Sequence, residues 1–454
     1  MRDLLVDAAE RSAAYLAGAG ARGVAPSADA VAALAAFDEA LPEGPTDDAA
    51  VLAMLDGVGS AGTVTTAGPR FFGFVIGGGV PASVAAGNLA NAWDQNAGLR
   101  IASPTVAKLE EVAGSWVLEL LGLPDDGACG FVTGATMANF TAVCAARHAL
   151  LRRAGWDVED QGLYGAPEIK VVVGAQYHSS VKKALALAGL GRRRVRVVPA
   201  DDQGRMIAAE LPELDERTLV IAQAGEVNSG AFDPFGVICE RARASGAWVH
   251  VDGAFGLWAK AAPARAALAE GVELADSWAT DCHKWLNVPY DSGMVICRDG
   301  GAVRAGMAAT APYLIEGDQR EPYHYTPELS RKGRGIEVWA ALKALGRSGV
   351  ADLVERTCRH AVRFAEGLDA AGYEILNDVV LNQVLVSFGD DAANERVIRA
   401  IQEDGTCWCG GSDWRGRRVM RISVSSWATT EADVELSLDA MIRCAKAAGC
   451  VVNR

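Results

Sequence analysis

A lysine lies directly after a run of residues typical of a buried β-strand. The run is Ser277 to Thr280, and the lysine stands in Asp281-Cys282-His283-Lys284-Trp285. A buried ammonium group is costly unless its pKa falls or a partner lies near it. Because a neutral amine is the nucleophile that forms imines, Lys284 is a candidate for Schiff-base chemistry. A lysine at a strand end that simply reaches water is the other interpretation of this segment alone.

An aspartate ends a second apolar run, Ala247 to Val251. In open α/β sheets, ligands bind beyond the carboxyl ends of the strands. The carboxylate of Asp252 can hold a protonated ring nitrogen of a cofactor at that edge, and Gly253 and Ala254 leave room for a flat ring. A structural Asp252 that caps the following turn is the alternative.

Two further strand-to-helix junctions carry small or polar residues. In Phe131 to Asn139, a strand leads into Gly134-Ala135-Thr136 and then a helix. Backbone N–H groups and the Thr136 hydroxyl could cradle a phosphate there, although a plain helix cap would look the same. His178 also follows an apolar strand and precedes a helix. It could stack on an aromatic ring or move protons, or it could be an incidental capping residue.

These four features occur along one predicted sheet. They are a phosphate cradle, a histidine for stacking, an anion for a ring nitrogen and an imine-forming lysine, in that order and each after a strand. They are the groups that pyridoxal 5′-phosphate (PLP) needs. The alternative interpretations would all have to hold at once, so the sequence predicts a PLP site.

The elements that must position these residues follow a regular alternation. From about 125 to 300, short β-rich runs alternate with segments of helical length. This pattern is typical of an α/β fold with one mostly parallel sheet covered by helices on both faces. We expect an N-terminal helical segment over 1–75, a large cofactor-binding domain over 76–345 and a small C-terminal α+β domain over 346–454. In the last part, Thr429-Thr430-Glu431 is typical of the start of a final helix.

Composition and charge exclude several classes of protein. The 454 residues are 50% hydrophobic with a formal net charge of −14. This charge repels phosphate backbones, so nucleic acid is not an expected partner. The basic cluster at 192–196 is interpreted as a solvated turn before a strand. The uncharged run Phe71 to Trp93 could span a bilayer by length, but its glycines, Pro81 and asparagines predict a buried loop and helix at a subunit interface.

Neither the cysteines nor one glycine-rich motif predicts a ligand-binding site. Ten cysteines and no evident secretion signal favour reduced thiols in the cytoplasm. Cys407-Trp408-Cys409 is the one close pair, and it has no further ligands nearby, so no zinc site is expected. Gly57 to Gly62 matches GxGxxG, but a capped helix precedes it and no acidic residue follows before Asp94. We therefore interpret it as a glycine-rich connection.

The chain resembles the PLP-dependent group II amino acid decarboxylases, the family of aromatic amino acid and glutamate decarboxylases. The stretches that carry the resemblance are TGATMANFTAVCAAR, YHSSVKKA, GEVNSGAFDP, HVDGAFG, DCHKWLNVPYDSG and RISVSSWATTEADV, spread over roughly residues 65 to 440. The resemblance implies the aspartate-aminotransferase-like type I fold. It also implies a homodimer with active sites at the interface.

The same resemblance implies a role for each site residue. Lys284 would form the internal aldimine, Asp252 would pair with the pyridine nitrogen and His178 would stack on the ring. Ala254 would pack on the opposite ring face. Arg331 belongs to a segment that would reach the phosphate from the neighbouring subunit. The cofactor contacts implied in addition to Lys284, Asp252 and His178 are Gly134, Ala135, Thr136, Ser180, Asn228, Ala254, His283 and Ser330.

The implied reaction is loss of CO₂ from an L-amino acid, with electrons flowing into the protonated pyridine ring. In the family a loop tyrosine then protonates Cα, and the segment from Pro312 to Thr326 is placed suitably, with Tyr323 or Tyr325 as the donor. Two surface aromatics of a loop are the alternative interpretation. Oxidative deamination to an aldehyde, or transamination, keeps the cofactor but changes the product. A non-catalytic scaffold is disfavoured because the lysine, aspartate and histidine are all present.

Departures from the family pattern leave the substrate open. Glu226 stands where relatives usually carry Thr or Asn, and Gly77 falls near a Thr that aromatic decarboxylases place beside the substrate. Cys282 replaces a Pro or Ala before His-Lys. Phe72 and Phe74 would line the substrate pocket with Gly77 and favour an aromatic or apolar side chain, but they are equally explained as core residues.

Overall fold

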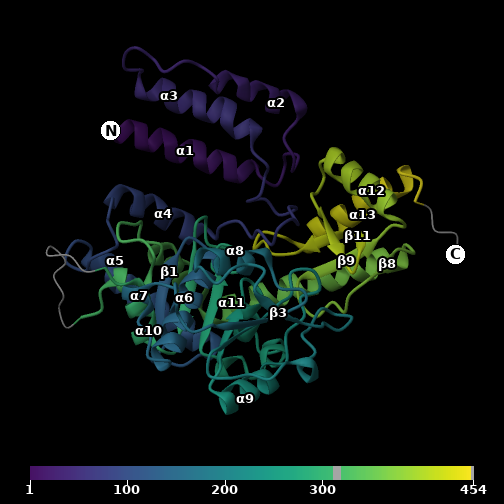
Figure 1. Cartoon of the computed structure of the whole chain (residues 1–454). Helices are drawn as coiled ribbons and strands as arrows, with labels where there is room; N and C mark the ends of the chain where they lie inside the picture. The colour runs from purple at the N-terminus through teal and green to yellow at the C-terminus, as the bar shows by residue number, and fades with distance from the viewer. Residues whose placement is uncertain (310–318, 451–454) are drawn as a thin grey trace. The chain divides into compact units, whose positions relative to one another are not determined.

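The computed structural model describes residues 1–309 and 319–450 (Figure 1). The chain forms two compact units. The first comprises Met1–Gly78, His360–Leu376 and Val384–Arg454, and the second comprises Gly79–Arg359 and Asn377–Gln383. The domain boundaries expected at 75 and 345 stay a prediction.

The second unit is built on a mostly parallel sheet, which confirms the predicted α/β class. Seven strands make up this sheet in the described chain. In spatial order they are β1 (Ala128–Val132), β7 (Gly293–Cys297), β6 (Ser277–Asp281), β5 (Trp248–Asp252), β4 (Thr218–Gln223), β2 (Lys170–Gly174) and β3 (Val195–Val198). Strand β7 is antiparallel to both of its neighbours, so β1 and β6 run in the same direction. Asp252 of β5 pairs with Ala279 of β6.

The central strands are mostly apolar and are buried on both faces. Every residue of β4, β5, β6 and β7 is buried, as expected of a sheet covered by helices on both sides. The described α-helices of this unit are α4 (Pro81–Trp93), α5 (Pro104–Leu121), α6 (Ala135–Arg153), α7 (Val158–Gln161), α8 (Ser179–Leu187), α9 (Phe235–Ser245) and α10 (Gly300–Met307). Helix α11 (Gly335–Ala370) is kinked at Gly346, where φ is 62° and ψ is 178°, and its last residues belong to the first unit.

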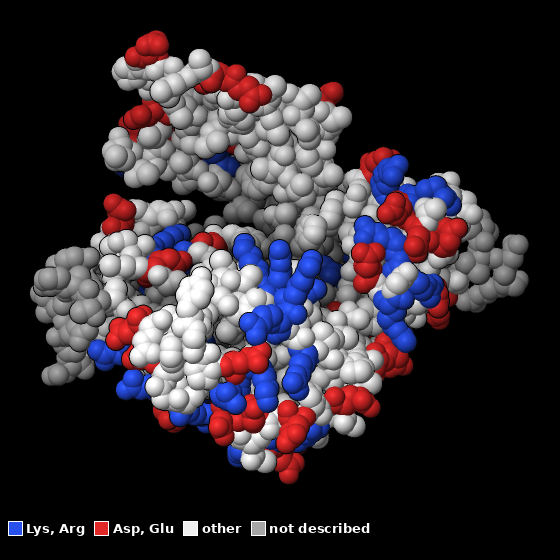
Figure 2. Space-filling view, viewed as in Figure 1, with Lys and Arg blue, Asp and Glu red and all other residues white. Residues whose placement is uncertain are grey.

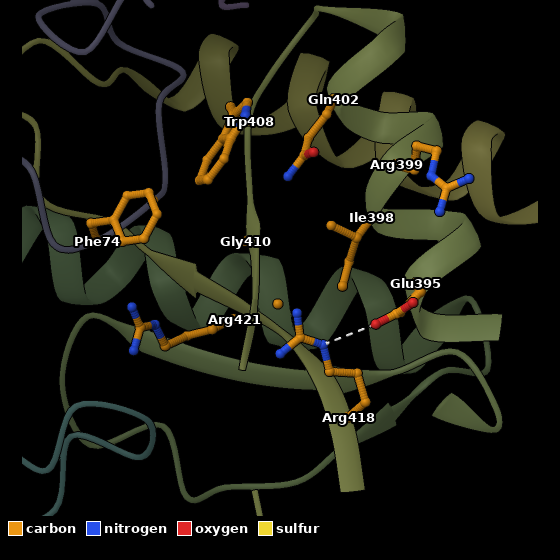
Figure 3. Close-up of a pocket in the computed structure, with 11 residues that line it drawn as sticks. Phe74, Glu395, Ile398, Arg399, Gln402, Trp408, Gly410, Arg418 and Arg421 are labelled. Carbon is orange, nitrogen blue, oxygen red and sulfur yellow. Dashed lines mark ion pairs between the residues drawn. The ribbon is translucent and has the colours of Figure 1, made fainter. Parts of the chain in front are cut away.

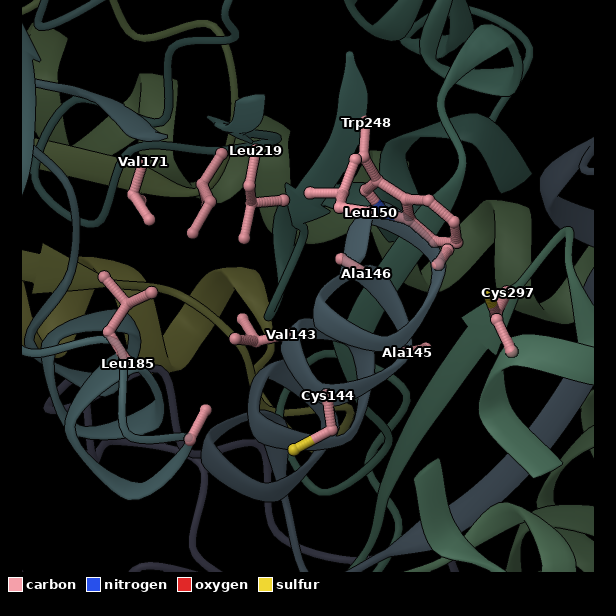
Figure 4. Packing of buried hydrophobic residues seen from close by; sticks show 14 of the residues in the cluster. Val143, Cys144, Ala145, Ala146, Leu150, Val171, Leu185, Leu219, Trp248 and Cys297 are labelled. Atoms are coloured by element: carbon pink, nitrogen blue, oxygen red, sulfur yellow. The ribbon is translucent and has the colours of Figure 1, made fainter. Parts of the chain in front are cut away.

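Helix α6 covers the sheet and carries the first turn of the predicted phosphate cradle. Its Val143 and Leu150 belong to one buried cluster with Val171, Leu219 and Trp248 of strands β2, β4 and β5 (Figure 4). Small residues of α6 let the helix approach the strands closely, which fixes where its N-terminus lies relative to the strand ends.

The first unit contains the N-terminal helices and a smaller sheet. Its described elements are α1 (Arg2–Gly18), α2 (Ala28–Ala33), α3 (Asp48–Met54), β8 (Glu374–Ile375), β9 (Gln383–Ser387), α12 (Asp391–Asp404), β10 (Gly410–Trp414), β11 (Arg417–Ser423) and α13 (Glu431–Ala447). The sheet order is β10-β11-β9-β8. Helix α13 begins with a capping box in which Thr430 and Asp433 bond reciprocally, as the sequence predicts.

One sequence interpretation needs correction. The run Gly57 to Gly62 is not a loose connection, because Leu55–Ser60 continues α3 as a π-helical turn. Asp56 fastens this turn by accepting hydrogen bonds from Ser60 Oγ at 2.7 Å and from Arg11 at 3.0 Å. Within this chain, the buried residues of α4 are Ser83 and Ala90, and the predicted burial of this helix at a subunit interface stays a prediction.

Surface charge and membrane character follow the sequence. On the face shown in Figure 2, Lys and Arg gather over α8 and β3, with Asp and Glu interspersed over the rest of the surface. The three arginines of 192–194 are exposed in the turn before β3, as predicted. Among the described helices, none is long and apolar enough to cross a membrane.

Candidate active site

The carboxyl ends of β1, β5 and β6 meet at one edge of the sheet. The loop after β5 is tied to β6, because Gly253 N donates to Ala279 O at 2.9 Å and Asp281 N donates to Ala254 O at 2.8 Å. The helix that follows β1 is tied to the same place, since Ala135 N donates to Asp281 Oδ1 at 2.5 Å. Three segments far apart in the sequence therefore surround one point.

Lys284 lies in the turn after β6. Its side chain is 20% exposed, and its Nζ lies 3.0 Å from Oδ2 of the buried Asp281. Trp285 anchors the turn, because its ring is fully buried and its Nε1 donates to Thr357 Oγ1 at 2.9 Å. The amine is thus held by a carboxylate instead of simply extending into water.

The first turn of α6 lies against the lysine segment and could hold a phosphate. A Cβ added at Gly134 would lie 3.0 Å from His283 Cε1 and 3.2 Å from Asp281 Oδ1, so only glycine leaves this space open. The first N–H groups of a helix lack intrahelical acceptors, and its positive end attracts anions. Ala135 and Thr136 supply those N–H groups.

His283 has its tautomer fixed by a backbone contact. Its Nδ1 accepts a hydrogen bond from Ser292 N at 3.1 Å, so Nε2 carries the proton of the neutral ring. Burial lowers the pKa of His283, which favours the neutral form. Its ring stacks on Tyr290 with centroids 4.2 Å apart. His283 therefore offers one N–H donor beside the start of α6.

His178, Ser180 and Asp252 form a second contact group. His178 caps α8, and its Nδ1 accepts from Ser180 N at 3.1 Å and contacts Ser180 Oγ at 2.8 Å. The Ser180 hydroxyl also lies 3.4 Å from Asp252 Oδ2, and Ala254 N donates to Asp252 Oδ1 at 3.3 Å. The structure therefore brings these four predicted residues together around a buried carboxylate.

His250, a neutral histidine that the sequence did not reveal, is linked to this group through Asn139. His250 Nε2 lies 2.8 Å from Asn139 Oδ1, and its Nδ1 lies 2.9 Å from Ser277 Oγ. Asn139 Nδ2 in turn donates to Ser180 Oγ at 3.4 Å. Complete burial lowers the pKa of His250 to about 3. The available signal was its position two residues before Asp252, on the same face of β5.

Glu226 has a local structural role that the sequence did not reveal. Its buried carboxylate accepts hydrogen bonds from Asn228 N at 2.8 Å, Asn228 Nδ2 at 3.1 Å and Ser229 N at 2.7 Å. The acid thus orders the turn after β4 and fixes Asn228. Asn228 follows the strand next to the one that carries Asp252.

The two residues predicted to reach a neighbouring subunit's phosphate, Ser330 and Arg331, lie in different surroundings. Arg331 is buried and makes two bonds to Glu110 of α5, at 2.6 and 2.8 Å, so its guanidinium is occupied within its own chain. Ser330 is exposed, and its Oγ accepts from Asn96 at 3.3 Å. The role of Ser330 stays a prediction.

The predicted proton donors lie at the edge of the sheet. Tyr323 and Tyr325 belong to a short 3₁₀ helix, Pro322–Tyr325, that packs on the edge strand β1, which β7 separates from β6. The guanidinium of Arg320 lies 4.4 Å above the ring of Tyr325. The beginning of the predicted loop, residues 312–318, lies outside the described residues. The proton-donor role therefore stays a prediction.

The three predicted substrate residues belong to the first unit. Phe72 is 1% exposed and packs edge-on against Phe364, as a core residue does. Phe74 is 61% exposed. It lines a hollow of about 350 Å³ together with Trp408 (Figure 3). That hollow also contains three arginines but no lysine. Gly77 is buried.

Comparison with known proteins gives a consistent family. A family model described as the pyridoxal-dependent decarboxylase conserved domain matches residues 32–389. An aromatic-L-amino-acid decarboxylase of Bacillus atrophaeus is 26% identical over 398 residues, which cover 82% of this chain and 80% of the relative. One of Drosophila lebanonensis is 29% identical, over 74% of this chain and 88% of the relative.

Solved structures share the fold of this chain. A structure of Oryza sativa TDC with PLP and tryptamine superposes with a TM-score of 0.90 at 22% identity, over 98% of this chain and 97% of the other. Mouse CSAD in the apo form superposes with a TM-score of 0.89 at 21% identity, with 98% of each chain covered.

The arrangement around Lys284 fits PLP on its own observations. The space that a Cβ at Gly134 would fill lies beside the positive end of α6 and the Nε2–H of His283. Asp252 offers a buried carboxylate in a neighbouring group. This chain therefore belongs to the pyridoxal-dependent decarboxylase family, as a PLP-dependent carboxy-lyase that acts on an L-amino acid.

Proposed function

We propose that the chain releases CO₂ from an L-amino acid with an aromatic or apolar side chain, and that Lys284 is the residue that bonds the cofactor aldehyde. The observation that carries the proposal is the position of the Lys284 amine. It contacts Asp281, and Asp281 is also bonded to the start of α6 and to the loop after Asp252. A lysine, a phosphate cradle and a buried carboxylate at one sheet edge are what this chemistry requires.

The residues around the site have separate tasks. Bound PLP supplies an aldehyde for the substrate nitrogen and a ring that accepts the electron pair left by departing CO₂. Asp252 keeps a proton on the ring nitrogen, because its own carboxylate is buried and fixed by Ala254 N. The Ser180 hydroxyl contacts both the Asp252 carboxylate and the His178 ring, so it fixes the position of these two side chains relative to each other.

The remaining tasks are binding and proton delivery. Ala135, Thr136 and His283 hold the phosphate with N–H donors. His178 would stack on the ring of bound PLP, and Ala254 would pack on its other face. Gly134, Asn228 and Ser330 complete the cofactor set that we propose. Tyr323 or Tyr325 gives the proton to Cα after CO₂ has left.

A homodimer is part of the proposal. Of the large hydrophobic side chains that are exposed in the described chain, two thirds lie within the first 101 residues. Helices α1, α2 and α3 contain no buried residue, and α4 exposes Leu89 by 56% and Trp93 by 42%. Apolar surface of this extent marks an interface, and a second copy of the chain would cover it. All ten cysteines are free and buried, which supports a reducing compartment such as the cytoplasm.

The central assignment is tested by replacing Lys284 with alanine and the exposed Lys183 of α8 with alanine as the control. We expect wild type and the control to show an imine absorbance band that borohydride removes, with CO₂ release from a substrate. The Lys284→Ala protein should lose both the band and turnover. Turnover near the wild-type rate in this variant would refute the assignment.

The substrate and product are tested together. PLP-loaded protein is screened with the standard amino acids for CO₂, and the products are examined for amine, aldehyde and peroxide. We expect amine from aromatic or apolar substrates. An aldehyde with peroxide would indicate oxidative deamination instead, and a keto acid would indicate transamination.

The loop assignment has its own variants. Tyr323→Phe or Tyr325→Phe should slow amine release or divert the product towards aldehyde, because the phenol proton is lost while the ring remains. If neither variant alters rate or product, both phenols are excluded as the donor.

A further inference from the structure

We propose that Asp281 competes with the cofactor phosphate for the start of α6 and thereby limits the affinity of the chain for PLP. This inference rests on the proposed function, because it takes the phosphate to bind at that helix end. It concerns the charge of one residue of this chain, and sequence reasoning gave that residue no role.

Asp281 already uses the groups that an anion would use. Its Oδ1 accepts from Ala135 N at 2.5 Å and lies 3.5 Å from His283 Nε2. Its Oδ2 lies 3.0 Å from Lys284 Nζ. The side chain is 3% exposed. One buried carboxylate therefore touches the helix end, the histidine donor and the lysine at the same time.

The reason for the contact is visible in the sequence of α6. The residue that caps this helix is Gly134, which has no side chain to accept a hydrogen bond. Asp281 supplies the missing acceptor from the end of β6, 146 residues away. Helix ends favour Asp and Asn alike as caps, so the hydrogen bond needs an oxygen but not a negative charge.

The charge itself opposes a phosphate. A phosphate ester carries a charge of about −1.5 to −2 near neutral pH, with its second ionisation near pH 6. Two anions in a partly buried site repel each other more strongly than they would in water. Lys284 and the helix end offset the carboxylate while the amine is free. Phosphate binding must then share the same donors with Asp281.

The test separates charge from shape with Asp281→Asn, which keeps the acceptor oxygen. Dissociation constants are measured for PLP and for pyridoxal, which carries the same aldehyde without the phosphate. The ratio of the pyridoxal constant to the PLP constant isolates the phosphate, since imine formation is common to both. Asp299→Asn is the control, because Asp299 also accepts a backbone hydrogen bond at the start of a helix, α10, as its own N-cap residue.

We expect Asp281→Asn to raise this ratio about tenfold, which corresponds to about 1.4 kcal/mol, while Asp299→Asn leaves it unchanged. An unchanged or lowered ratio in Asp281→Asn would overturn the inference. If that variant does not fold, the wild-type ratio is compared at pH 5.5 and pH 8. It should be lower at pH 8, where the phosphate is the dianion, and a higher ratio there would overturn the inference. A wild-type chain without any imine band would instead overturn the proposed function itself.

Discussion

A single methyl group at Gly293 should weaken cofactor binding, because it would push against the start of α6. Gly293 begins β7 and faces the residue that caps α6. A Cβ added there would lie 2.5 Å from Gly134 Cα, 2.7 Å from its C and 2.9 Å from its N, all backbone atoms. Ordinary contact begins at 3.4 Å, so the start of α6 must retreat by about 0.9 Å in Gly293→Ala.

The expected magnitude follows from what that retreat breaks. The bond from Ala135 N to Asp281 Oδ1 is 2.5 Å long and would lengthen beyond the range of a good hydrogen bond. Overpacking costs about 1–3 kcal/mol, and a hydrogen bond to a charged group contributes about 1.5–3 kcal/mol. We expect the melting temperature to fall by roughly 4 °C or more, and PLP affinity to fall about tenfold or more, because each 1.4 kcal/mol is a factor of ten.

The assay combines thermal melting of the cofactor-free protein with PLP titration followed by absorbance. Gly236→Ala is the control, because a Cβ there meets nothing within 4 Å and the residue lies in α9. It should be neutral or stabilising by up to about 1 kcal/mol. If Gly293→Ala melts and binds PLP like wild type, the backbone contact between β7 and α6 does not set the cradle.

Three further predictions concern buried groups. Arg331→Ala leaves the Glu110 carboxylate buried without its guanidinium, so it should destabilise the protein by about 3–5 kcal/mol in melting experiments, and replacing both residues with methionine should restore most of this loss. The pKa of His250 is lowered by burial to about 3. The unfolded chain therefore binds the proton first as pH falls below about 6.5, and stability should drop by about 2 kcal/mol between pH 8 and pH 5; His250→Gln should lack this part of the pH dependence. Burial raises the pKa of Cys129 to about 12 and of Cys144 to about 11. An aromatic disulfide reagent at pH 8 should thus modify the native thiols slowly and all ten only in denaturant, and rapid modification of several native thiols would contradict the burial.

The large sheet could be predicted because its strands carry a strong signal. Strands such as β5 and β7 are buried on both faces, so they are mostly apolar and have polar or small residues at or near their ends. Lys284 and Asp252 could be proposed as site residues for a similar reason, since each is a polar residue at or just after the end of such a run. Their roles stay a prediction.

Partners that depend on tertiary packing could not be predicted. Asp281 looked like any acid at a strand end, and its role appears only when Gly134 comes to lie beside it. Arg331 was assigned to a phosphate, but it pairs with Glu110, 221 residues earlier in the chain. The burial of α4 at a subunit interface, which its uncharged sequence predicts, stays a prediction, because within the chain only Ser83 and Ala90 of this helix are buried.

The reversed direction of β7 gives the site a mechanical property. In the described sheet, β1 is joined to the other strands only through β7, and the same strand is the return arm of the hairpin that carries Lys284. In the proposed function, the phosphate would bind at the helix after β1 and the aldehyde at the lysine between β6 and β7, so both contacts would depend on the pairing of β7. A fluctuation that separates β7 from its neighbours would then release both ends together, and the holoenzyme should lose its cofactor in one concerted opening and not by stepwise loosening of one contact after another.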